Sequence, residues 1–162
     1  MKNNIFKSIL LVFVLSSLVS CEDFVEVDSP KHRIVGEEVF NDPETAQSAM
    51  RGVYNQLVRL DYSGGWQNSV TALAGLSGDN LDALRPANIT YLEFDHHEIL
   101  PENSRNLGLW TSAYSVIYMA NAIIEGLENS SLEEELRVSL IGEAKFIRAF
   151  TYLYLVNLYN DV

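Results

Sequence analysis

The sequence predicts an all-α fold of tetratricopeptide-like helix hairpins, with a long irregular loop region between the first two long helices. Three observations predict it. Apolar residues recur at helical spacing near residues 43–60, 105–127 and 132–159. A short polar turn joins the last two segments, and small residues lie beside aromatic ones on both. Residues 61–104 contain glycines and prolines without sustained periodicity, which indicates loop.

Composition restricts the class of protein. The chain has 162 residues, of which 48% are apolar and 10% aromatic, so it is not a mostly disordered chain. Its net charge of −11 argues against a nucleic-acid partner, because phosphate backbones bind basic surfaces. Cys21 is the only cysteine, which excludes a disulfide framework and a multi-cysteine metal site.

Residues 1–20 are predicted to be a lipoprotein signal peptide. Lys2 and Lys7 form a basic start, and the apolar run that follows is shorter than the roughly 20 residues of a membrane span. The run ends in Leu18-Val19-Ser20-Cys21, which resembles a bacterial lipobox. The resemblance implies that Cys21 carries a diacylglycerol and becomes the first, acylated residue. An ordinary secretory signal with an incidental cysteine is the alternative.

Residues 21–41 are predicted to form a lipidated tether, because they are acidic, contain Pro30 and lack an apolar register. Two lipid groups on Cys21 would suffice for stable anchoring. Glu22-Asp23 resembles the acidic signals that direct some lipoproteins to the cell surface. We therefore expect a lipid-anchored, surface-exposed protein.

The first long helix is predicted to begin after Asp42, a good N-cap, with Pro43 at its first position. It should end near Leu60, before the Gly64-Gly65 turn. Its apolar residues are Ala46, Ala49, Met50, Val53, Tyr54, Leu57 and Val58.

The loop region that follows, residues 61–104, is expected to hold one short helix, Val70–Leu76, and otherwise loop. Long loops in compact domains are usually functional. Binding residues are therefore expected in this region.

The last two helices are expected to form an antiparallel pair. Ser131 with Glu134, or Ser130 with Glu133, would make a capping box for the third helix. Asn121 is expected to be a buried polar residue that bonds a neighbouring backbone. The predicted stripe of the second helix is Leu107, Trp110, Tyr114, Ile117, Asn121 and Ile124, beside Ala113 and Ala120. That of the third is Leu136, Leu140, Ala144, Ile147, Phe150, Tyr154 and Leu158, with Phe146, Ala149, Leu153 and Val156 on a second face.

The third helix carries the most recognisable segment, Gly142-Glu143-Ala144-Lys145-Phe146-Ile147-Arg148-Ala149-Phe150. It resembles the Gly-Glu-Ala-x-Phe-x-Arg-Ala segment of the SusD/RagB family. Trp110, Tyr114 and Asn121 match the preceding family helix, and Val39-Phe40 with Gly52 and Tyr54 matches the first. Glu143, Lys145 and Arg148 are expected to be solvated or paired with neighbouring helices.

The resemblance implies an outer-membrane lipoprotein that captures oligosaccharides or polysaccharides and hands them to a SusC-like TonB-dependent transporter. Members of the family are not enzymes and need no cofactor. They are several times longer than this chain, so residues 42–162 are expected to be an incomplete, N-terminal helical domain. The third helix has a large apolar surface with few partners in this sequence, which also indicates an incomplete domain.

Glycan recognition requires flat aromatic faces and planar polar groups. On residue type alone, the loop region offers Tyr62, Trp66, Asp79, Asn80 and Tyr91, with Asp82 nearby. Trp66 lacks the helical spacing of a core residue; the alternative is that it plugs the helical scaffold.

Two other functions stay open. The first is a helical scaffold that docks on a transporter or another protein without binding sugar. The second is a surface glycoside hydrolase that uses Asp79, Asp82 or Glu98. No metal site is predicted, because the adjacent His96-His97 pair lacks the spacing of metal ligands.

Overall fold

Helices alone make up the regular structure of the computed structural model, which describes residues 36–84, 88–160 and 162. These residues fall within one compact unit, Val35–Val162. No strand occurs among them, so the all-α prediction is confirmed. The helices are α2 (Gly36–Val39), α3 (Pro43–Arg59), α4 (Val70–Ser77), α5 (Ile89–Asp95), α6 (Ser104–Glu128) and α7 (Glu134–Tyr159).

Helix α3 begins where the sequence predicts. The Asp42 side chain accepts hydrogen bonds from the backbone N–H groups of Glu44 and Thr45, both at 3.0 Å. Pro43 follows at the first helical position, where its missing N–H leaves no bond unmade. The helix buries Ala46, Met50 and Val53.

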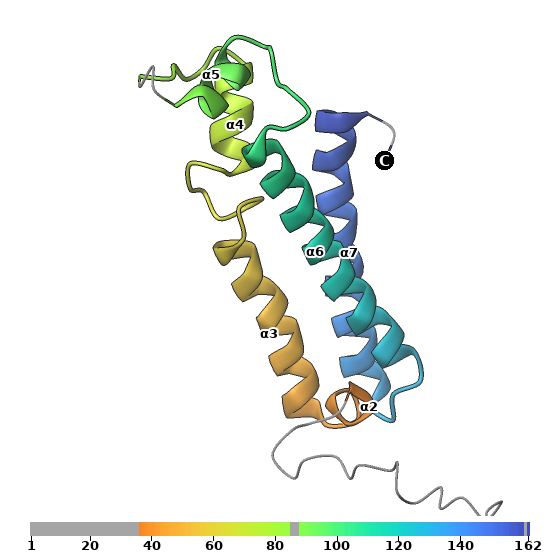
Figure 1. Cartoon of the computed structure of the whole chain (residues 1–162). Coiled ribbons are helices and arrows are strands. Elements are labelled where there is room, and N and C mark those ends of the chain that lie inside the picture. Colours follow the sequence, from red (N-terminus) through yellow and green to blue (C-terminus); the bar gives the residue numbers. More distant parts are fainter. Residues whose placement is uncertain (1–35, 85–87, 161) are drawn as a thin grey trace, which may run out of the picture. The chain divides into compact units, whose positions relative to one another are not determined.

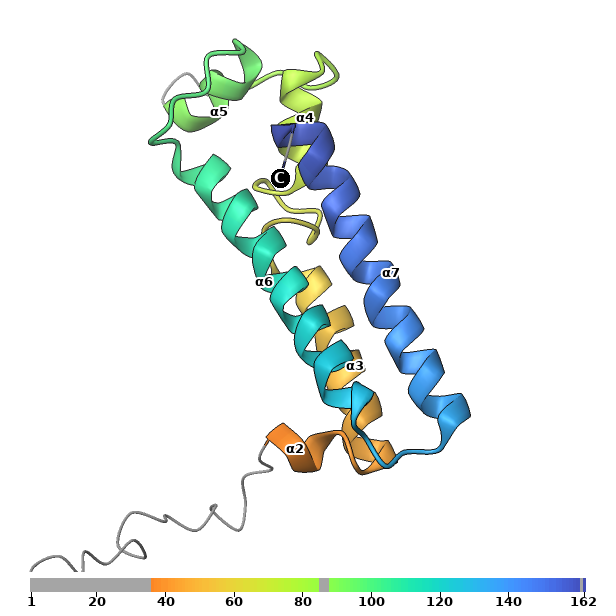
Figure 2. The same ribbon diagram turned by 90° about the vertical axis from the view of Figure 1, so that its right-hand side faces the viewer.

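The three long helices run alternately up, down and up through the unit (Figures 1 and 2). Helices α6 and α7 form the predicted antiparallel pair and share the most extensive contact, and α3 packs against both. Helices α4 and α5 pack on each other and lie at the end of the unit where α3 ends and α6 begins. The loop region is thus gathered at one end of the helical scaffold.

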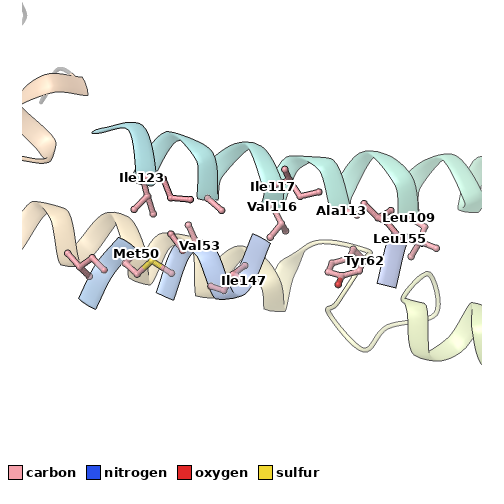
Figure 3. Packing of buried hydrophobic residues seen from close by; sticks show 14 of the residues in the cluster. Met50, Val53, Tyr62, Leu109, Ala113, Val116, Ile117, Ile123, Ile147 and Leu155 are labelled. Atoms are coloured by element: carbon pink, nitrogen blue, oxygen red, sulfur yellow. The ribbon is translucent and has the colours of Figure 1, made fainter. Parts of the chain in front are cut away.

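The core lies along α6, where Figure 3 shows residues of α3 and α7 packing against it. Ala113, Ala120 and Ala144 are fully buried, and their small side chains let the helices approach closely. The predicted stripe of α6 is wrong in part, because Leu107 is 64% exposed and Trp110 37%. The helix buries Leu109, Ser112, Ala113, Val116, Ile117, Ala120, Ile123, Ile124 and Leu127 instead.

The buried face of α7 also differs in part from its predicted stripe. Its buried residues are Leu140, Ala144, Ile147, Thr151 and Leu155. Because the apolar residues run nearly all round this helix, its sequence alone does not single out one face. Leu136 of the expected stripe is partly buried against the core. The remaining members of the stripe and of its second face are exposed, namely Phe146, Ala149, Phe150, Leu153, Tyr154, Val156 and Leu158.

The turn between α6 and α7 does not form the predicted capping box. Glu133 occupies the N-cap position of α7, and its side chain makes no capping hydrogen bond. The Ser130 hydroxyl instead donates to the Phe40 carbonyl and accepts from the Leu132 N–H. The serine is therefore used to hold the segment before α3.

That segment packs on the scaffold although it was expected to belong to the tether. Phe40 lies so close to Gly126 that a Cβ added to the glycine would overlap its ring. Gly36–Val39 form the short α2 just before it. The folded unit therefore begins upstream of residue 42.

Helix α4 confirms the predicted short helix and is capped by the Ser69 side chain. Helix α5, in contrast, lies where loop was expected. Asn88 at its N-cap makes no side-chain capping bond, and Ile89, Thr90 and Tyr91 are poor helix formers. Its packing on α4 stabilises it more than its own sequence does.

The predicted signal peptide, Cys21 and most of the tether lie outside the described residues. Within them, α6 is long and apolar enough to cross a membrane by length and composition. Of its most apolar stretch, 44% is buried inside the fold.

Candidate functional site

The five residues expected to contact glycan separate into three places around α4. Trp66 and Tyr91 lie near the start of α4, Asp79 and Asn80 follow its end, and Tyr62 enters the core. The loop region therefore offers two exposed polar or aromatic surfaces and one packing residue.

Tyr62 is buried, with 2% of its surface exposed. Its ring makes an edge-to-face contact with Tyr154 at 6.2 Å, and its backbone N–H donates to the Ser112 Oγ at 2.8 Å. Burial raises the pKa of its hydroxyl. The residue joins the loop to α6 and α7 rather than presenting a ring face to solvent.

Trp66 is 72% exposed and is the most accessible aromatic ring near α4. Its neighbour Gln67 accepts a hydrogen bond from the Tyr91 hydroxyl at 3.0 Å, so the Trp66 loop and α5 are tied together. One face of the Tyr91 ring is covered by Arg105, whose guanidinium carbon lies 3.6 Å from the ring centroid. The ring is also partly buried against the hydrophobic core, so little of Tyr91 is left for a ligand.

Arg105 belongs to a group of side chains that we call the Asn103 cluster. Its members are Asn68, Thr90, Tyr91, Glu93, Asn103 and Arg105. Arg105 donates through Nε to the Thr90 hydroxyl at 2.7 Å and through Nη1 to the Asn68 side chain. The cation thus connects the loop before α4, helix α5 and helix α6.

Asn103 is the most buried polar member of the cluster, with 3% exposure. Its Oδ1 accepts from the backbone N–H groups of Arg105 and Asn106, at 2.9 and 3.1 Å, and so caps α6. Its Nδ2 donates to the Thr90 carbonyl at 3.0 Å and to Glu93 Oε2 at 2.7 Å. One amide therefore fixes both the start of α6 and the position of α5.

At the other end of α4, Asp79 and His97 face each other. Both have left-handed backbone conformations, with φ of 55° and 58°, which are strained for residues with side chains. The imidazole Nε2 lies 3.6 Å from the Asp79 carboxylate, and both side chains are largely exposed. Asn80 is exposed beside them.

A hollow of about 670 Å³ lies between this end of α4 and the neighbouring ends of α6 and α7. Its polar lining comes from Ser77, His97, Asn106, Asn157 and Tyr159. The Tyr159 hydroxyl donates to Asn106 Oδ1 at 2.8 Å, and burial raises its pKa to about 12. The hollow thus combines apolar walls with fixed polar groups.

The candidate acids of a hydrolase, Asp79, Asp82 and Glu98, are all exposed. Within the described ranges, no three histidine, cysteine or acidic side chains are arranged to hold a metal ion. His96 and His97 contribute to no such group.

Sequence reasoning missed Asn68, Asn103 and Arg105. A signal existed for Asn103, because an asparagine directly before a periodic helical segment is typical of an N-cap. No local signal exists for the stacking of Arg105 on Tyr91, since it depends on how α5 packs against α6.

Glu143 and Arg148 of segment 142–150 pair with neighbouring helices and Lys145 is exposed, so all three are solvated or paired as expected. Glu143 accepts a hydrogen bond from the Tyr54 hydroxyl of α3 at 2.9 Å, and Arg148 donates to Asn121 of α6 at 2.7 Å. The expected backbone partner of Asn121 is therefore wrong, because its oxygen accepts from a side chain on α7.

These features define an all-helical protein whose long helices are joined by Glu143 and Arg148 of segment 142–150. A family model described as starch-binding associating with outer membrane, of the SusD-like type, matches residues 23–162. The chain therefore belongs to the SusD-like family.

Curated relatives agree with this assignment. SusD-like protein P25 of Formosa agariphila is 29% identical, over 94% of this chain and 30% of that protein. A SusD-like protein of Bacteroides ovatus is 28% identical, over 96% of this chain and 28% of that protein. This chain thus spans less than a third of the length of these relatives. No solved structure matches the chain.

Proposed function

We propose that the complete protein is a lipid-anchored outer-membrane protein that captures oligosaccharides at the cell surface and delivers them to a SusC-like TonB-dependent transporter. The match of residues 23–162 to a family described as starch-binding carries the proposal. The lipobox-like segment that ends at Cys21 supports the anchor.

Among the residues chosen from the sequence, Trp66 is the best placed to stack on sugar, since most of its surface is exposed. Asp79 and Asn80 offer exposed hydrogen-bonding groups at the other end of α4. Tyr91, which is partly buried and covered by Arg105 on one face, would hold the Trp66 loop through its hydrogen bond to Gln67, and Tyr62 would support the loop from within the core. The Asn103 cluster holds the Trp66 loop and α5 in place, which lowers the entropy lost on binding at Trp66.

The test is a binding screen of the complete, folded protein against immobilised plant and host polysaccharides. We expect saturable binding to at least one of them. Absence of binding to the whole panel, from protein with a helical circular dichroism spectrum, would contradict the proposal.

The anchor has its own test. The change Cys21→Ala should abolish lipid labelling and release the protein from membranes, because two lipid groups on this residue would supply the attachment. Unchanged fractionation of the variant would show that the protein is held by something else.

We also propose that the protein is not an enzyme. Incubation with the glycans that it binds should release no reducing sugar. Release that disappears on changing Asp79, Asp82 or Glu98 to the amide would overturn this statement in favour of a surface hydrolase.

A second candidate function is a scaffold that docks on a transporter without binding sugar. The exposed apolar side chains of α7 favour it, with Phe146 at 69% and Leu153 at 59% exposure. Co-purification with an outer-membrane barrel, combined with no sugar affinity, would support the scaffold over glycan capture.

A further inference from the structure

A row of aromatic side chains runs along the surface of α6, and its first ring, Trp110, contacts Tyr159 of α7. Trp110, Tyr114 and Tyr118 are spaced four residues apart, so they lie one above the other on the helix surface. The row extends about 12 Å along the helix axis, at 1.5 Å per residue. Trp110 is 37% exposed and Tyr118 75%, so the row presents ring surface to solvent.

The first rings of the row are held in place. Trp110 and Tyr114 lie 4.7 Å apart between ring centroids, and Tyr159 contacts Trp110 edge to face at 5.0 Å. Tyr159 is itself fixed by its hydrogen bond to Asn106. A ring surface that is already fixed loses little entropy when a ligand stacks on it.

The row borders a groove of about 560 Å³ between α6 and the end of α3. Gln56, Thr111 and Ser115 add an amide and two hydroxyl groups to its lining, beside Leu60 and Met119. None of the described residues that line the groove is charged, although the chain carries 33 formal charges, 22 acidic and 11 basic.

We propose that this groove binds a neutral oligosaccharide, with the aromatic row against the C–H faces of successive sugar rings. The amide and hydroxyl groups pair with sugar hydroxyls. A charged sugar would lose hydration here without meeting a counter-charge, which disfavours uronates and sulfated sugars. An apolar partner helix would leave Gln56, Thr111 and Ser115 without hydrogen bonds.

This inference rests on the proposed function and narrows it to a substrate class and a second surface. It also gives Trp110 and Tyr114 a function that the sequence pattern, which assigned both to the core stripe, did not suggest. The groove is formed by different residues from the loop surface around Trp66.

The test compares Tyr118→Ala with Phe146→Ala in the complete protein. Both positions are exposed aromatic residues on long helices, at 75% and 69% exposure, so neither change should disturb folding. We expect Tyr118→Ala to weaken binding of a neutral oligosaccharide, identified by the glycan screen, by at least about fivefold, through the loss of one stacking ring. Phe146→Ala should bind as the wild type does, and a uronate oligosaccharide of equal length should bind at least about tenfold more weakly than the neutral one.

A second measurement follows the fluorescence of Trp110 in the complete protein. The difference in fluorescence between the wild type and Trp110→Phe isolates the Trp110 signal, and this difference should change saturably as neutral oligosaccharide is added. Two results would contradict the groove as a binding site while leaving the proposed function in place. The first is that the wild type binds and Tyr118→Ala binds with an affinity within twofold of it. The second is that the Trp110 signal stays constant at saturating oligosaccharide. A wild type that binds no glycan at all would overturn both.

Discussion

Asn103 offers the sharpest test of how the loop region is held on the helical scaffold. The change Asn103→Ala removes the cap of α6, which contributes about 1 kcal/mol. It also leaves the Thr90 carbonyl and Glu93 without the Nδ2 donor. The neutral bond contributes about 1 kcal/mol and the bond to the carboxylate about 1.5–3 kcal/mol. Because water can partly replace the lost donor, we expect the free energy of unfolding to fall by about 2–4 kcal/mol.

The change Asn103→Asp separates the two halves of this interaction. The introduced side chain keeps an oxygen for the N–H groups of Arg105 and Asn106, and a negative charge is favoured at a helix N-terminus. Its other oxygen replaces a donor that lies 2.7 Å from Glu93 Oε2, so two carboxylates meet. Their repulsion raises the pKa of the pair in the folded state above its unfolded value.

The pH dependence follows from that sign. A folded-state pKa above the unfolded value means that the folded protein binds the shared proton more tightly. The stability of the Asn103→Asp variant should therefore be highest at acidic pH and fall as pH rises through the raised pKa. The free energy of unfolding of the variant should therefore lie further below that of the wild type at pH 7 than near pH 5.

The assay is urea unfolding followed by circular dichroism, at both pH values, for wild type and both variants. Asn55→Ala, at an exposed position of α3, serves as the control and should stay within about 0.5 kcal/mol of wild type. An Asn103→Ala loss below about 0.5 kcal/mol, or an Asn103→Asp deficit that does not change with pH, would refute the reasoning.

Three further predictions concern the scaffold. The buried hydroxyl of Tyr62 has no hydrogen-bond partner of good geometry in the described part of the chain, so Tyr62→Phe should cost no stability in urea unfolding; a loss above about 1 kcal/mol would reveal a partner. Leu155→Ala, at a position 1% exposed, should cost about 2–5 kcal/mol, whereas Leu153→Ala, 59% exposed on the same helix, should stay within about 0.5 kcal/mol; equal losses would contradict the assignment of the buried face. Burial raises the pKa of Tyr159 to about 12, above the unfolded value of 10.0, so its contribution to stability should decline as pH rises from about 10 to 12. The deficit of Tyr159→Phe should accordingly be smaller at pH 11 than at pH 8, and a deficit that grows with pH would contradict the direction of the shift.

The long helices could be predicted because their signals are local. Asp42 and Pro43 mark the start of α3, and the periodic segments of α6 and α7 give their lengths to within a few residues. Their buried faces could not be predicted as well. A helix that is apolar nearly all round leaves the choice of face to its neighbours, and here the fully buried alanines decide it.

The loop region was less predictable, because its structure depends on contacts between distant segments. Tyr62 and Trp66 lie four residues apart, yet one is 2% exposed and the other 72%. No periodicity connects these residues, so their burial depends on how the loop meets α6 and α7. Helix α5 has no side-chain cap that would mark its start in the sequence. The stacking of Arg105 on Tyr91 depends on where α5 lies against α6.

The central claim is that the complete protein binds glycan, and calorimetric titration tests it most directly. The mature protein should release heat on addition of the oligosaccharide that it prefers, with saturation at a fixed stoichiometry. Heats that never saturate, for every neutral and acidic oligosaccharide tried and from a protein with the expected helical spectrum, would contradict the claim.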